Sequence, residues 1–91
     1  SPAIRVIEVL KREGAEVEYY DPWVTEYKEH GQVVTGLKEI SPEIVKSYDL
    51  VMVTTAHTNV DYQMVSDNAV VVFDTKNVMK QIENRDNIEV L

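Results

Sequence analysis

Two apolar runs in this chain each end in a polar tip whose side chains could bind a ligand. Residues 50–53 (Leu-Val-Met-Val) lead into a tip that ends at His57, and residues 70–73 (Val-Val-Val-Phe) lead into a tip that contains Asp74 and Lys76. Strands buried on both faces of a parallel sheet have this continuous apolar character. Ligands bind beyond the carboxyl ends of such strands. His57, Asp74 and Lys76 are therefore the predicted ligand-binding residues.

The chemistry of these side chains suits an anionic ligand. Lys76 would place a positive charge at the end of a buried strand, in a chain of net charge −7, as a phosphate or sugar phosphate requires. The alternative is an exposed lysine beside Asp74. For His57 the two interpretations are a hydrogen bond to the ligand and a cap on a neighbouring helix. The residues alone leave these alternatives open.

Composition argues against several other kinds of site. Three isolated glycines cannot form the glycine-rich loops that hold a dinucleotide or a triphosphate, and a chain without cysteine has no thiolate ligand or cysteine nucleophile. His30 and His57 lack metal-ligand spacing to carboxylates, so no metal is expected. No Gly-x-Ser-x-Gly elbow supports a hydrolytic triad. The acidic charge argues against nucleic acid, and no apolar stretch reaches the roughly 20 residues that span a membrane.

The elements that would position the two tips alternate between helix and strand. Ser1 and Pro2 can start a helix, and apolar spacing predicts that helix over residues 2–13, ended by Gly14. Alternation of apolar and polar residues predicts a strand over residues 15–20. A loop is expected over residues 23–35. Further short helices are predicted at 41–48, around 62–65 and at 78–82, and strands at 50–53, 70–73 and 88–91.

Strands joined by helices predict right-handed parallel crossovers and hence an α/β fold. The expected architecture is a Rossmann-like, doubly wound, mainly parallel sheet flanked by helices. Such a sheet usually opens with a strand, whereas this chain opens with a helix, so the first strand is expected to be missing. The open edges would then be closed by direct strand pairing or by self-association. A start at Ser-Pro rather than Met favours a piece of a longer protein.

An aromatic cluster follows the predicted strand over residues 15–20. Tyr19, Tyr20 and Trp23 surround Asp21-Pro22 and could stack on a base. Packing against another domain is the favoured interpretation, because aromatic side chains at strand ends commonly fill such faces.

The same residues resemble a known family, the UDP-glucose/GDP-mannose dehydrogenases, in their carboxyl-terminal, UDP-sugar-binding domain. The resemblance spans nearly the whole chain. It rests on Ser-Pro-Ala at 1–3, Gly-Ala-Glu-Val at 14–17, Tyr-Asp-Pro at 20–22, the segment from 49 to 57, and Asp-Thr-Lys-Asn at 74–77. The last two segments look most like enzymes that act on UDP-N-acetylglucosamine or a close relative, with UDP-glucose enzymes next.

The resemblance implies that residues 1–91 form one domain of a three-part enzyme. Relatives bind NAD in an amino-terminal domain, dimerise through a helical middle, and oxidise the sugar C6 alcohol to a carboxylate in two NAD-dependent steps through a cysteine thioester. This chain has no cysteine, so alone it is expected to be inactive. The family's basic residue for the nucleotide sugar maps onto Lys76, where many relatives have arginine.

The expected partners are a UDP-sugar and, for the parent enzyme, a second copy in a homodimer; a cytoplasmic location and a role in polysaccharide precursor synthesis are also expected. A rival interpretation is a free-standing α/β module without catalysis that contacts a protein partner through residues 19–23. Fold class does not separate the two, because one fold supports many functions.

Overall fold

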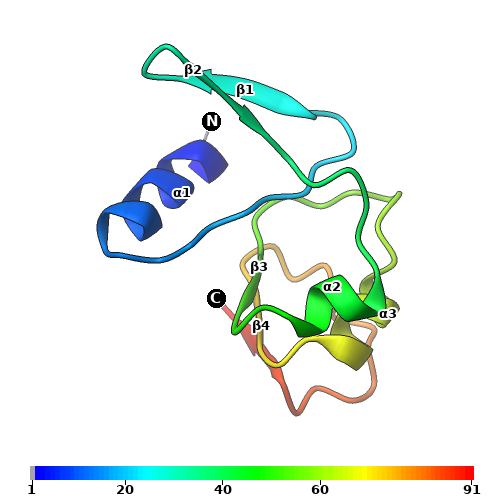
Figure 1. Cartoon of the computed structure of the whole chain (residues 1–91). Coiled ribbons are helices and arrows are strands. Elements are labelled where there is room, and N and C mark those ends of the chain that lie inside the picture. Colours follow the sequence, from blue (N-terminus) through cyan, green and yellow to red (C-terminus); the bar gives the residue numbers. More distant parts are fainter. Residues whose placement is uncertain (1) are drawn as a thin grey trace. The chain divides into compact units, whose positions relative to one another are not determined.

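The computed structural model describes residues 2–91 and divides the chain into two compact units, residues 1–40 and 41–91 (Figure 1). Ser1, the predicted cap of the first helix, lies outside the described residues. That residues 1–91 form one functional domain stays a prediction. Each unit is described by itself.

The first unit begins with the predicted amphipathic helix, α1 (Pro2–Arg12). Gly14 ends it with φ of 97°, a conformation that glycine adopts without strain. The N–H of Gly14 donates to the carbonyl of Lys11, and the N–H of Ala15 donates to that of Leu10, both at 3.0 Å. These two bonds form the Schellman cap that the glycine predicts.

The predicted strand over residues 15–20 is wrong. This segment is irregular, and the described residues provide no ladder for it. Its backbone instead bonds to a residue 18 positions later, where the N–H of Leu37 donates to the carbonyl of Tyr19 at 2.8 Å. Alternation of apolar and polar residues is compatible with a strand that has one apolar face. A strand also needs the backbone of a neighbouring strand to bond with.

The predicted loop over residues 23–35 is also wrong, because most of it forms an antiparallel hairpin. Strand β1 (Glu26–Glu29) pairs with β2 (Gln32–Thr35), with Glu26 opposite Thr35 and Glu29 opposite Gln32. The two turn residues, His30 and Gly31, both have positive φ, at 51° and 79°. Two-residue hairpin turns of this kind match the twist of the strands. The more usual Asn-Gly or Asp-Gly signal is absent, so the hairpin was missed.

A close approach in this unit yields a testable prediction at Gly36. A Cβ added there would lie 2.7 Å from Cε2 of Tyr19, whose ring also packs against Tyr27 with centroids 5.4 Å apart. Gly36→Ala should therefore lower the free energy of unfolding by about 1–3 kcal/mol in urea denaturation, since overpacking forces neighbouring groups to move. In a Tyr19→Ala background the same substitution should cost far less. Equal costs in both backgrounds would show that the ring is not the cause.

The second unit contains the parallel sheet, in the order β3-β4-β5. Its strands are β3 (Val51–Val53), β4 (Val72–Asp74) and β5 (Ile88–Val90). The helices are α2 (Pro42–Lys46) and α3 (Tyr62–Asn68), which contact each other beside the sheet (Figure 1). Ser41 and Asp61 cap them by accepting from the N–H groups of Ile44 and Met64. The parallel sheet flanked by helices confirms the Rossmann-like α/β class, and the antiparallel hairpin is an addition to it.

The apolar core of this unit lies between the sheet and the two helices. Strand β4 starts two residues later than predicted, because Val70 and Val71 remain 60% and 37% exposed while Val72 is fully buried. The buried apolar residues of the whole described chain all lie in this unit: Val45, Val53, Val65, Ala69, Val72, Met79 and Ile88. The buried apolar residues thus lie in the unit that carries the two polar tips.

The helix predicted at residues 78–82 is wrong, because hydrogen-bonded turns replace it. The N–H of Ile82 donates to the carbonyl of Met79 at 3.0 Å, which is the spacing of a turn rather than of an α-helix. The N–H groups of Val78 and Met79 bond to the carboxylate of Asp74. Apolar periodicity at these positions reflects burial of Met79 and not a helix.

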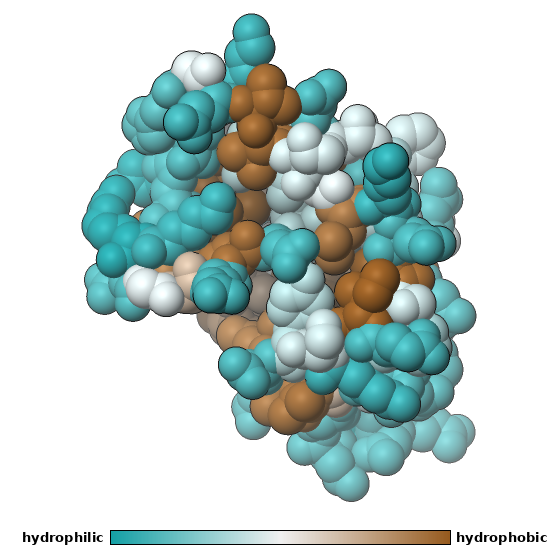
Figure 2. Space-filling view, viewed as in Figure 1, coloured by the Kyte–Doolittle hydropathy of each residue, from teal (hydrophilic) through white to brown (hydrophobic). Residues whose placement is uncertain are grey.

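Apolar surface on the face shown in Figure 2 is divided into patches by hydrophilic side chains. On this face, hydrophobicity alone does not mark a binding site. Among the helices of residues 2–91, none has the length and apolar character needed to cross a membrane. The exposed large apolar side chains are Val9, Trp23, Val24, Val33, Leu50, Val70, Val71, Val90 and Leu91.

Candidate functional site

The two polar tips predicted from the sequence lie next to each other at the carboxyl edge of the sheet. Strands β3 and β4 are parallel, with Val53 opposite Asp74. Beyond that pair, Thr75 donates twice to the carbonyl of Val53, from its backbone N–H at 3.0 Å and from its hydroxyl at 2.6 Å. Thr75 therefore locks the start of one tip to the end of the neighbouring strand.

Asp74 organises the second tip from within. Its side chain is fully buried, and it accepts three backbone hydrogen bonds: from the N–H of Lys76 at 3.1 Å, of Val78 at 3.2 Å and of Met79 at 2.8 Å. Asn77 lies inside this loop with φ of 54°. A buried carboxylate is stable only with such donors around it. Asp74 thus fixes the loop that carries Lys76, which is a positioning role; its predicted contact with a ligand stays a prediction.

Lys76 has an immobilised backbone and an exposed side chain. Its N–H is held by Asp74, whereas the side chain extends into solvent at the end of β4. Asp74 binds the backbone of Lys76 and the loop that follows it, so its oxygens are already occupied by amide donors. An ammonium group presented in this way can meet an anionic group such as phosphate at little reorganisation cost.

The first tip is held by a residue that the sequence analysis did not single out for the site. The hydroxyl of Tyr62, at the start of α3, accepts from the N–H of His57 at 3.0 Å and donates to the carbonyl of Thr55 at 3.4 Å. His57 is half-buried within this turn. A tyrosine directly after the helix cap Asp61 is the signal that could have identified this anchor. The position of Tyr62 is set by α3, and its hydroxyl in turn holds the backbone of the first tip.

The aromatic cluster lies in the other unit and forms part of a separate hollow. Asp21 accepts from the N–H groups of Trp23 and Val24, at 2.8 and 3.1 Å, and Trp23 is 72% exposed. A cavity of about 460 Å³ is lined by residues of 20–38, including Tyr20 and Lys38. This volume suffices for a small ligand. Interdomain packing by this cluster stays a prediction, with base stacking as its alternative.

Comparison with protein-family models matches residues 1–81 to the UDP-glucose/GDP-mannose dehydrogenase family, UDP binding domain. The chain belongs to this family. The matched residues include both polar tips, while β5 lies beyond them. Neither the search of curated proteins nor the search of solved structures found a match.

Membership gives this chain a ligand class. A UDP-binding domain must bind a diphosphate, and the two tips of this UDP-binding domain present a lysine ammonium and a half-buried histidine at one edge of a parallel sheet. Open α/β sheets bind ligands at this edge. The geometry and the family therefore point to the same ligand chemistry, nucleotide-sugar binding.

Proposed function

We propose that this UDP-binding domain holds the nucleotide sugar of an NAD-dependent UDP-sugar 6-dehydrogenase. The reaction would oxidise the C6 alcohol of a UDP-hexose or UDP-N-acetylhexosamine to a uronate. Two hydrides pass to two NAD molecules and water supplies the second carboxylate oxygen. The family match carries this proposal, because it covers both tips of the candidate site.

Each residue of the candidate site has a proposed task in binding. The Lys76 ammonium pairs with a phosphate oxygen of UDP, and the His57 side chain donates or accepts a hydrogen bond at the neighbouring tip. Asp74 holds the loop in the conformation that presents Lys76, through its three backbone contacts. Preformed geometry of this kind avoids the cost of ordering a loop when the ligand binds.

The chemical step requires groups that these 91 residues do not contain. The chain has no cysteine to form a thioester and no glycine-rich turn for NAD. In this proposal other parts of the parent enzyme, itself a homodimer, supply both. Because those parts are needed for the chemical step, the 91-residue chain should bind UDP without oxidising any sugar.

The test is NADH formation by the natural full-length protein with UDP-glucose and with UDP-N-acetylglucosamine, alongside UDP binding by the 91-residue chain. The proposal predicts two NADH per molecule of the preferred sugar and UDP binding without turnover by the chain alone. UDP binding by the chain, combined with no NAD-dependent oxidation of either sugar by the full-length protein, would overturn the proposed reaction and leave the binding assignment intact.

A further inference from the structure

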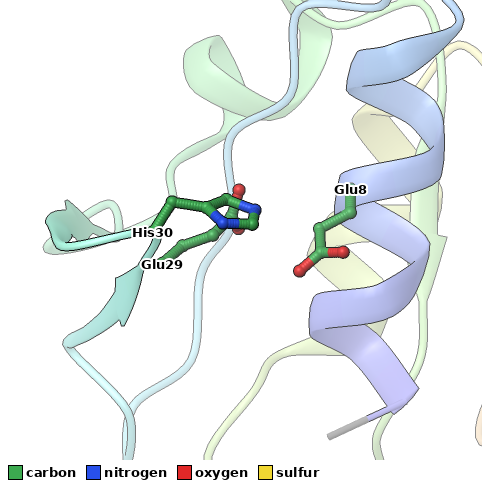
Figure 3. A group of neighbouring side chains, drawn as sticks. All are labelled: Glu8, Glu29 and His30. Atoms are coloured by element: carbon green, nitrogen blue, oxygen red, sulfur yellow. The ribbon is translucent and has the colours of Figure 1, made fainter.

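Three side chains that are distant in sequence meet in the first unit. Glu8 lies on α1, Glu29 is the last residue of β1, and His30 is the first residue of the hairpin turn. One potential ligand atom from each lies within 4.8 Å of the others. Figure 3 shows the carboxylate of Glu8 and the ring of His30 facing each other, with the carboxylate of Glu29 beside the ring.

The hairpin turn brings this cluster together. His30 has φ of 51°, which is uncommon for a residue other than glycine, and Gly31 completes the two-residue turn. Strand β1 thus delivers a carboxylate and an imidazole from consecutive residues, and α1 contributes the second carboxylate. The sequence did not predict this metal site because one of its three groups is distant in the chain. Glu8 on α1 precedes Glu29 by 21 residues.

A second observation indicates that the cluster lacks a partner. Oε2 of Glu29 is buried and has no hydrogen-bond donor among the described residues. Glu8 is itself half-buried, so two carboxylates lie close together out of full contact with water. A buried carboxylate oxygen without a donor is costly, and like charges nearby add to that cost. A cation bound between the carboxylates removes both penalties.

A second buried group without a partner lies two residues before Glu29 on β1. The hydroxyl oxygen of Tyr27 is buried without a hydrogen-bond partner among the described residues.

We infer that Glu8, Glu29 and His30 bind a divalent transition-metal ion, with Zn²⁺ as the ion that fits best. Two carboxylate oxygens and one imidazole nitrogen are ligands of Zn²⁺ at bond lengths of about 2.0–2.2 Å. Mg²⁺ and Ca²⁺ prefer oxygen ligands throughout. Ligand atoms of a tetrahedral zinc ion lie about 3.3–3.6 Å apart, so side-chain rotations that bring these atoms closer by roughly an ångström complete the site. A fourth position stays open for water.

The site is distinct from the proposed UDP site in both residues and chemistry. All three metal ligands belong to residues 1–40, whereas the proposed nucleotide contacts belong to residues 41–91. Zinc binding can therefore be measured without UDP, and its failure would leave the UDP proposal untouched.

The test is calorimetric titration of the 91-residue chain with ZnCl₂. We expect saturable binding of one Zn²⁺ per chain. Glu8→Gln, Glu29→Gln and His30→Asn should each weaken binding at least about tenfold, since even the loss of a group that only supports a metal ligand costs about 10–100-fold. Asparagine is chosen at His30 because it tolerates positive φ, so the hairpin turn is retained.

Two matched controls separate this site from adventitious binding. Glu26→Gln removes an exposed carboxylate from the same strand, and His57→Asn removes the other histidine; neither should change Zn²⁺ affinity. The inference is overturned by an absence of saturable binding, by His30→Asn or Glu8→Gln with unchanged affinity, or by a loss of affinity in His57→Asn. Glu8→Gln lies within a helix and keeps the side chain's shape, so its result holds independently of the hairpin.

Discussion

Replacement of Asp74 by alanine should lower the free energy of unfolding of the 91-residue chain by about 3–5 kcal/mol. The carboxylate is fully buried and accepts the N–H groups of Lys76, Val78 and Met79. Each buried donor that loses its acceptor costs about 1–3 kcal/mol, and the two part-buried donors recover some of that by bonding to water. Since small domains are stable by about 5–15 kcal/mol, the variant should be close to unfolding.

Urea denaturation of Asp74→Ala, Asp74→Asn and Asp86→Ala measures this effect. Asparagine keeps one acceptor oxygen but has a donor in place of the other. The loss of unfolding free energy in Asp74→Asn should therefore be smaller than in Asp74→Ala. Asp86 is exposed and serves as the control for loss of one negative charge. A loss of less than about 1 kcal/mol for Asp74→Ala would show that the loop does not depend on the carboxylate.

Replacement of Lys76 by alanine should weaken UDP binding about 10- to 30-fold without loss of stability. A hydrogen bond to a charged group contributes about 1.5–3 kcal/mol, and the lower part of that range applies to an exposed ammonium. Lys76→Arg should retain or improve affinity because a guanidinium can bind phosphate through two parallel hydrogen bonds. Calorimetric titration with UDP at two salt concentrations gives both the affinity and its electrostatic part.

Lys46→Ala is the matched control for Lys76→Ala. Lys46 is exposed in the last turn of α2, which leads into the amino end of β3, away from the edge where the two tips lie. The substitution changes the net charge by the same amount and should leave UDP affinity within about twofold of the original. Equal weakening by the two substitutions would mean that UDP responds to overall charge and not to a contact with Lys76.

The parallel sheet could be predicted because its signals are local. Continuous apolar runs at 50–53 and 70–73, separated by a capped helix, indicate buried strands with a crossover, and the structure places β3 and β4 there. The caps at Ser41 and Asp61 are similarly visible as residue types before short apolar faces. The exact start of β4 could not be read, because Val70 and Val71 are apolar yet exposed.

The first unit was predicted poorly because the residue pattern does not show which of its segments pair with each other. Residues 15–20 alternate like a strand but form no ladder with the described residues, and Tyr19 bonds to Leu37 instead, while residues 26–35 form the hairpin. The choice between these segments depends on which edges meet, and the single-residue pattern does not contain that information. His30 in a positive-φ position is an uncommon turn residue, which hid the hairpin further.

Part of the candidate site could be predicted from the sequence, and part of it depends on the folded structure. His57, Asp74 and Lys76 could be proposed from the strand ends, but the sequence could not distinguish the buried Asp74 from the exposed Lys76 beside it. The loop at 78–82 was predicted as a helix from its apolar spacing. That spacing does not show that the N–H groups of Val78 and Met79 bond to the carboxylate of Asp74. The link from Tyr62 to the turn at His57 arises only once α3 is in place.

The most direct test of the UDP site is an amide-resolved NMR titration of the 91-residue chain with UDP. The chain has a mass of 10.4 kDa, so each backbone amide can be followed separately. Binding at the carboxyl edge of the sheet predicts that the largest shift changes occur at residues 54–57 and 74–77, and that Lys76→Ala reduces them at a fixed UDP concentration. Shift changes concentrated in residues 20–38, around the cavity of the first unit, would contradict the account.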